Sequence, residues 1–122
     1  MSHIVTIKTE VRDPVAVASA CRRLGLPEPV RGTAKLYAGE ATGLLIRLPG
    51  WTYPTVVKTE TGTVEFDNFN GCWGDRAQLD MFLQIYAVEK ATREAQLRGH
   101  SVSETQLADG SIRLSIAVGG EA

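Results

Sequence analysis

Three side chains outside the first expected helix are of the types that bind soft metals or support thiol chemistry: His3, Cys72 and His100. Cys72 stands just before an expected long helix, a position that favours the thiolate form of cysteine. A cysteine nucleophile also needs a histidine base, which His3 or His100 supplies only where the fold brings it close. We therefore expect Cys72 to be a structural loop residue, with thiol catalysis as the alternative.

The sequence predicts no cofactor and no metal site. A zinc site takes three or four ligands, and these histidines and Cys72 have no close-spaced ligand partner. Met1-Ser2-His3 matches an amino-terminal copper or nickel clamp only if Met1 is retained. No glycine-rich turn ends in Lys-Ser or Lys-Thr, so a phosphate-binding loop is not expected. Glu65 and Asp67 are predicted to lie on a solvated strand end rather than to form a catalytic pair.

Aromatic side chains are concentrated around residues 68–74, the loop that contains Cys72. We expect Phe66, Phe69, Trp73 and Trp51 to gather there. Most of this set should be satellite core, and the remainder is a candidate patch for a partner or ligand, since aromatic residues anchor interfaces.

A long helix is predicted from Asp75 to Gly99, directly after this loop. Asp75 is a good N-cap with Gln78 at the capping-box spacing, and Gly99 is a stop signal. The first half of the helix is apolar around most of its circumference, so it should be covered on two sides, whereas the second half is polar. We place the candidate binding site where the loop meets this helix, with the residues Phe69, Cys72, Trp73, Tyr86 and His3.

The elements before this helix follow from alternation and helix signals. Residues His3 to Val11 alternate as a strand with one face toward the core. Asp13-Pro14 opens a helix that Gly25 ends, with Cys21 as a small core residue on its apolar face. The turn-rich stretch 27–66 is expected to hold four strands, namely Lys35–Tyr37, Leu44–Leu48, Thr55–Thr59 and Thr63–Phe66.

A hairpin is predicted after the long helix. Asp109-Gly110 indicates a two-residue turn, and apolar residues alternate after it from Ile112 to Val118. Such a turn pairs Leu107 with Ile112 and places Gln106 opposite Arg113 on the solvent face.

The bulk composition favours one domain that recognises partners by shape. The chain has 122 residues, 43% of them hydrophobic and 22% charged, with a net charge of −1. This charge provides no field for nucleic acid, and acidic residues would offset a basic patch of Arg22, Arg23, Arg31, Lys35 and Arg47. A membrane-spanning helix needs about 20 apolar residues, so no membrane segment is expected. Without a hydrophobic signal region, the cytoplasm is the expected location.

Short motifs along the chain resemble the hypothetical chloroplast reading frame thirty-five family, a domain of unknown function from cyanobacteria, algal plastids and other bacteria. The resembling segments occur in this order: Met1-Ser2-His3, Ile7-Lys8-Thr9, Asp13, Trp73-Gly74, Gln84-Ile85-Tyr86-Ala87, Lys90, Ala95, Gly99 and Asp109-Gly110-Ser111-Ile112. The chain departs from the family at Ile4, where Phe is more usual, and at Gly71-Cys72, so Cys72 inherits no family role. The resemblance implies no established activity. Some family members are encoded beside an AAA-type ATPase, which implies an accessory or adaptor role.

We therefore expect an α+β fold with two helices packed on an antiparallel or mixed sheet. The specific expectation is a ferredoxin-like core with an inserted hairpin and a C-terminal hairpin. The expected function is that of a non-enzymatic accessory protein for a protein partner, with an AAA-type ATPase as the candidate. The alternative is a small-molecule site or thiol enzyme at the loop before the long helix.

Overall fold

The computed structural model describes residues 4–118 of the chain. Its contacts define two compact units, of which one ends at Tyr86 and the other begins at Ala87. The long helix α2 (Arg76–Leu97) runs through the boundary between them. The two units therefore share one continuous helix, and the single domain expected from the sequence stays a prediction.

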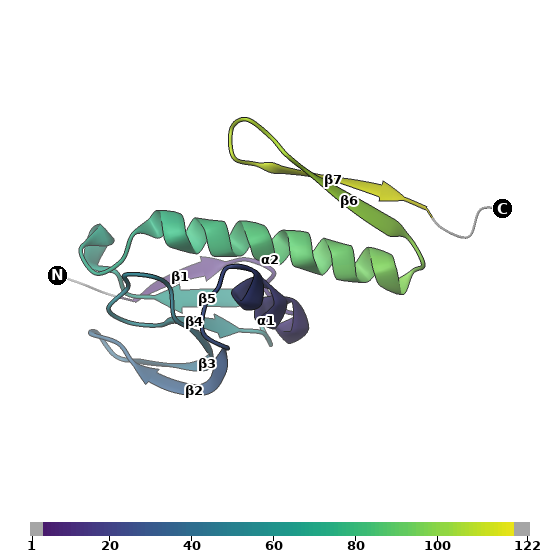
Figure 1. Cartoon of the computed structure of the whole chain (residues 1–122). Helices are drawn as coiled ribbons and strands as arrows, with labels where there is room; N and C mark the ends of the chain where they lie inside the picture. The colour runs from purple at the N-terminus through teal and green to yellow at the C-terminus, as the bar shows by residue number, and fades with distance from the viewer. Residues whose placement is uncertain (1–3, 119–122) are drawn as a thin grey trace. The chain divides into compact units, whose positions relative to one another are not determined.

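The first unit is built on a five-stranded antiparallel sheet (Figure 1). Its strands lie in the order β1-β5-β4-β3-β2, so that β2 to β5 form a meander and β1 joins its far edge beside β5. The helix α1 (Pro14–Arg23) connects β1 to β2. The strand bounds are β1 Val5–Lys8, β2 Val30–Lys35, β3 Glu40–Ile46, β4 Thr55–Lys58 and β5 Thr63–Phe66.

Both helices begin and end where local chemistry predicts. The carboxylate of Asp13 accepts hydrogen bonds from the first amides of α1, and that of Asp75 accepts one from Ala77. At the end of α2, Gly99 adopts a φ of 79° and the amide of His100 donates to the carbonyl of Ala95 over 2.9 Å. This is the Schellman arrangement, which satisfies carbonyls that the last helical turn leaves unpaired.

The main core of the first unit lies between one face of the sheet and the two helices. Helix α1 buries Val17 and Cys21, and the first half of α2 buries Leu79 and Phe82. The facing strand side chains are also buried, among them Leu44, Ile46, Val57 and Val64. The alternation predicted for this sheet face is therefore confirmed.

The opposite face of the sheet encloses a second, smaller core. Ala34, Leu36, Ala41 and Val56 are buried there together. The sheet curls around them: the amide of Ala38, at the tip of the β2–β3 hairpin, donates to Asp67 beyond β5 over 3.3 Å. Ala34 and Ala41 are partners across this hairpin.

The second unit contains the hairpin formed by β6 (Ser101–Gln106) and β7 (Ile112–Ala117). Its register differs by one residue from the prediction, since Gln106 pairs with Ile112 and Thr105 with Arg113. The turn has three residues rather than two: the amide of Leu107 donates to the carbonyl of Ser111, and Gly110 has a φ of 89°. A type I turn followed by a left-handed glycine adds this residue.

The α+β class, with two helices and an antiparallel sheet, is confirmed. The ferredoxin-like arrangement is not, because in that fold the strand after the second helix returns to the first sheet. Here β6 pairs with β7 in a separate sheet. The predicted strand Lys35–Tyr37 is also misplaced: β2 ends at Lys35, and a turn follows it.

Candidate functional site

The loop between β5 and α2 is a tightly bonded structure. A short 3-10 turn (Phe69–Gly71) opens it, and the amides of Gly71 and Trp73 both donate to the carbonyl of Asn68. Phe69 and Asn70 have φ values of 48° and 52°, a backbone region that costs a non-glycine residue roughly 1 kcal/mol or more. The surrounding bonds hold this strained conformation in place.

Trp73 is the centre of an aromatic cluster, here called the Trp73 cluster, whose members are Tyr37, Tyr53, Phe69 and Trp73. The ring of Trp73 lies with its centroid 4.9 Å from that of Phe69, 5.1 Å from that of Tyr37 and 5.6 Å from that of Tyr53. Tyr53 and Phe69 are half-buried, whereas Tyr37 is 64% exposed. The cluster therefore presents an exposed aromatic ring on a fixed aromatic base.

A second aromatic contact lies under the start of α2. Trp51 meets Phe66 edge-on at 5.6 Å, and its indole Nε1 donates to the carbonyl of Asp75 over 3.1 Å. Gly74 packs against the face of this indole so closely that a Cβ there would lie 2.6 Å from Cγ of Trp51. The backbone amide of Thr52 donates to the carbonyl of Trp73. The loop before α2 is thus clamped to the segment after β3.

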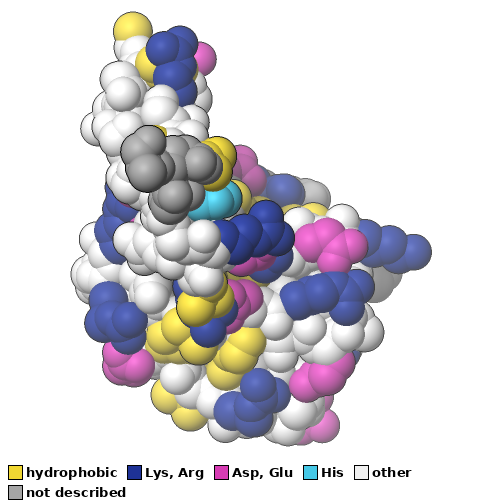
Figure 2. All heavy atoms as spheres, turned by 90° about the vertical axis from the view of Figure 1, so that its right-hand side faces the viewer, with side chains coloured by type: hydrophobic (Ala, Val, Ile, Leu, Met, Phe, Trp, Pro, Cys, Tyr) yellow, Lys and Arg dark blue, Asp and Glu magenta, His cyan; other side chains and the backbone are white. Residues whose placement is uncertain are grey.

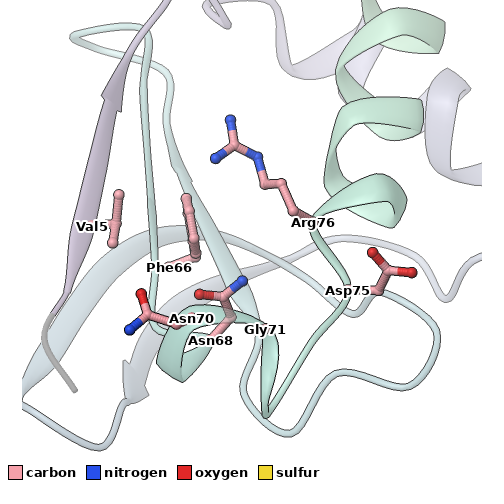
Figure 3. A pocket seen from close by; sticks show the side chains of 7 residues that line it. All are labelled: Val5, Phe66, Asn68, Asn70, Gly71, Asp75 and Arg76. Carbon is pink, nitrogen blue, oxygen red and sulfur yellow. The ribbon is translucent and has the colours of Figure 1, made fainter. Parts of the chain in front are cut away.

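An open pocket of about 610 Å³ lies beside this clamp. Figure 3 shows the side chain of Arg76 extending toward Val5 and Phe66, while the carboxylate of Asp75 points away. Two carboxamides, those of Asn68 and Asn70, lie at the lower end of the same pocket. The pocket thus combines an apolar wall with hydrogen-bonding groups.

Arg76 is held in this pocket by two contacts. Its Nε donates to Asp80 over 3.0 Å, and its guanidinium carbon lies 5.4 Å from the centre of the Phe66 ring. Among residues 4–118 its two terminal nitrogens have no partner, so one edge of the guanidinium is available for a carboxylate or similar group.

The burial of Asp67 contradicts the prediction that Glu65 and Asp67 lie on a solvated strand end. Its side chain is fully buried, and Oδ2 accepts the hydrogen bond from Ala38. Within the described residues Oδ1 has no partner. Glu65 is mostly buried as well and pairs with Lys58 at 3.1 Å. The curl of the sheet covers this strand end, which alternation alone did not indicate.

The two cysteines differ as predicted. Cys21 is buried in the main core, and this burial raises the pKa of its thiol to about 11. Cys72 is exposed. Residues 4–86 contain no histidine, His100 belongs to the second unit, and His3 lies outside the described residues. A histidine base for Cys72 therefore does not come from the described part of the first unit.

Tyr86 does not join the loop. Its hydroxyl accepts hydrogen bonds from the amides of Arg12 and Asp13, each over 3.1 Å, and so supports the start of α1. It stands ten residues after Arg76 in α2, or about 15 Å along the helix axis. Of the predicted site residues, the structure brings together Phe69, Cys72 and Trp73.

Tyr37, Tyr53 and Arg76 are site residues that sequence reasoning missed. Tyr37 lies in the turn between β2 and β3, two residues before Gly39. A large aromatic residue in a glycine-containing turn indicates an exposed side chain that could bind a partner. Arg76 was detectable from its position at the helix start, four residues before Asp80.

Metal ligation, membrane insertion and surface charge are the other properties of the described residues that bear on function. No group of three or more His, Cys, Asp or Glu side chains is placed to hold a metal ion in the part of the chain from 4 to 118. Neither helix in that part has the length and apolar character of a membrane span. Figure 2 shows basic and acidic side chains interspersed on one face, and Arg22 and Arg31 each lie 3.7 Å from a glutamate.

Comparison with known protein families, with curated proteins and with solved structures finds no match. The geometry of the site is therefore the basis for any statement about function.

Proposed function

We propose that this chain is a non-enzymatic accessory protein that binds a protein partner through the Trp73 cluster. The observation that carries the proposal is the exposed ring of Tyr37, which packs against Trp73 at a tilt of 48° with the ring centroids 5.1 Å apart. Aromatic anchors that are already ordered lose little side-chain entropy on binding, which is why they dominate interface energies.

The surroundings of the cluster support the same proposal. The loop that carries Trp73 is fixed by backbone bonds on both sides, so its surface is organised before any partner arrives. The pocket of about 610 Å³, which Asn68 and Asn70 of the same loop help to line, can receive one side chain of a partner, with the guanidinium edge of Arg76 suited to an acidic one. The interspersed surface charge favours recognition by shape over electrostatic attraction.

An AAA-type ATPase is the candidate partner. This choice rests on the resemblance to the hypothetical chloroplast reading frame thirty-five family, which is itself part of the proposal. An accessory protein for such an ATPase needs a rigid docking surface and no catalytic group, and the Trp73 cluster meets that requirement.

The test is recovery of a partner from the native host with the tagged full-length chain. Tyr37→Ala should reduce the recovered partner at least about tenfold, the scale of a hot-spot truncation. Val30→Ala is the matched control, because Val30 is 61% exposed at the other end of β2 and should leave recovery unchanged. Recovery of no abundant partner, or equal loss in both variants, would refute the proposal.

A small-molecule site is the second candidate function, favoured by the pocket volume and by the unpartnered edge of Arg76. Ligand pockets commonly measure about 300–1,000 Å³. Small organic acids titrated into labelled protein should shift the side-chain NMR signals of Asn68 and Arg76. Arg76→Gln should abolish the shift of the Asn68 signal, whereas Arg47→Gln, at an exposed arginine outside the pocket, should not.

A further inference from the structure

The hairpin of β6 and β7 has almost no core of its own. Between residues 87 and 118, the buried apolar side chains are Val88 and Ala95, and both belong to α2. On β7, Ile116 is 49% exposed, and Val118 just beyond it is 60% exposed. A single two-stranded hairpin is marginally stable in water, and a third strand or a covering surface is needed for independent stability.

The outer edge of β7 is unpaired in the described structure. The strand pairs with β6 on one side, so every second residue directs its amide and carbonyl outward on the other. Edge strands are usually protected by lysine, proline or a bulge. Between Ile112 and Ala117 there is no lysine or proline, and Arg113 is the one charged residue.

The sequence of β7 is complementary to itself in an antiparallel arrangement. With a two-fold axis at Ser115, Leu114 faces Ile116 of a second copy and Ile112 faces its Val118. Arg113 then faces Ala117, so no like charges meet. The apolar face of β7 becomes continuous across both copies, because residues opposite each other in a ladder lie on the same face.

We propose that β7 pairs edge to edge with β7 of a second copy of this chain, forming a four-stranded antiparallel sheet. The new ladder supplies the missing third strand to each hairpin and satisfies its outward backbone groups. One strand from each copy buries less than the roughly 1,200 Å² of a stable interface, so we expect a weak dimer whose population depends on concentration. This inference is independent of partner binding by the Trp73 cluster.

The test uses the full chain in analytical ultracentrifugation from about 1 µM to about 1 mM. The wild-type chain should pass from monomer to dimer across this range. Ile116→Lys should raise the dimer dissociation constant at least about tenfold, because it places a charge in the shared apolar face. Val15→Lys is the matched control, since Val15 is also 49% exposed but lies on α1, and it should leave the dissociation constant unchanged.

The position of the axis is tested by charge exchange at Ser115, which is exposed and pairs with Ser103 within one chain. Ser115→Glu and Ser115→Arg should each weaken self-association, because like charges meet at the axis. An equimolar mixture of the two variants should restore dimers. Circular dichroism and amide NMR spectra matching those of the wild-type monomer establish that each variant is folded.

Three results would overturn the proposal. The first is a wild-type chain that stays monomeric at about 1 mM. In that case no second copy covers the hairpin, which is then covered within one chain or open to solvent. The second is a dimer that Ile116→Lys does not weaken. The third is a mixture of the Ser115 variants that associates no better than either variant alone.

Discussion

Replacing Gly74 with alanine tests the clamp that holds the loop before α2. A Cβ at Gly74 would lie 2.5 Å from Cε2 and 2.6 Å from Cγ of the Trp51 indole. Carbon atoms in favourable contact are about 3.5–4.0 Å apart, so the ring must move by about 1 Å. The indole cannot move freely, because its Nε1 is bonded to the carbonyl of Asp75 and its edge packs on Phe66.

The expected loss of stability follows from these contacts. Overpacking a well-filled site costs about 1–3 kcal/mol, and loss of the hydrogen bond from Trp51 adds about 1 kcal/mol. We therefore expect Gly74→Ala to lower the free energy of unfolding by about 2–4 kcal/mol. Gly32→Ala is the control, since its Cβ would meet Leu45 at an ordinary 3.9 Å and should cost far less.

The assay is urea unfolding followed by circular dichroism, which does not depend on Trp51 as a reporter. A double-mutant cycle with Trp51→Leu isolates the contact. In the Trp51→Leu background, Gly74→Ala should lose most of its effect, because the smaller side chain leaves room for a methyl group. An equal loss of stability in both backgrounds would refute the explanation by steric overlap with the indole.

Three further predictions concern other features of the first unit. A thiol reagent should modify exposed Cys72 rapidly and buried Cys21 only on unfolding, which mass spectrometry of the labelled chain would show. The pKa of Cys21 is raised from 9.0 to about 11 in the folded chain. The neutral buried thiol therefore contributes to the stability of the fold below pH 9, and this contribution is lost as the pH rises toward 11. Between pH 9 and pH 11 the free energy of unfolding should fall by about 2–3 kcal/mol more in wild type than in Cys21→Ala. If the free energies of the two proteins fall in parallel with pH, the thiol does not have this effect. Tyr86→Phe should cost about 1–3 kcal/mol in urea unfolding, because the amides of Arg12 and Asp13 lose their acceptor; an unchanged midpoint would show that water replaces the hydroxyl.

The capping and stop residues of each helix were sufficient to locate both helices in the sequence. Asp13 and Asp75 cap the elements that their positions predict, and Gly99 ends α2, because each of these roles depends only on neighbouring residues. The alternation of Leu44 and Ile46 likewise indicated the face toward the main core.

The predictions of the hairpin register and of the aromatic cluster were wrong or incomplete. The register depends on whether the turn has two or three residues, and the cluster depends on contacts between residues that are distant in sequence. Asp109-Gly110 is compatible with a two- or three-residue turn, and the bond between Leu107 and Ser111 selects the longer one. Tyr37 follows β2 and Tyr53 precedes β4, so only the curl of the sheet brings both to Trp73. Periodicity in the sequence carries no information about that curl.

The composition of the Trp73 cluster has a consequence for the order of folding. Its rings come from the turn after β2, the segment before β4 and the loop after β5, so the cluster closes large loops of chain. Contacts between residues far apart in sequence form late, because the chain entropy must be lost before they contribute. The fluorescence of Trp73 should therefore change after the β4–β5 hairpin and the helices have formed, since their contacts are closer in sequence. A chain emerging from the ribosome would present its aromatic surface only once the whole meander is complete.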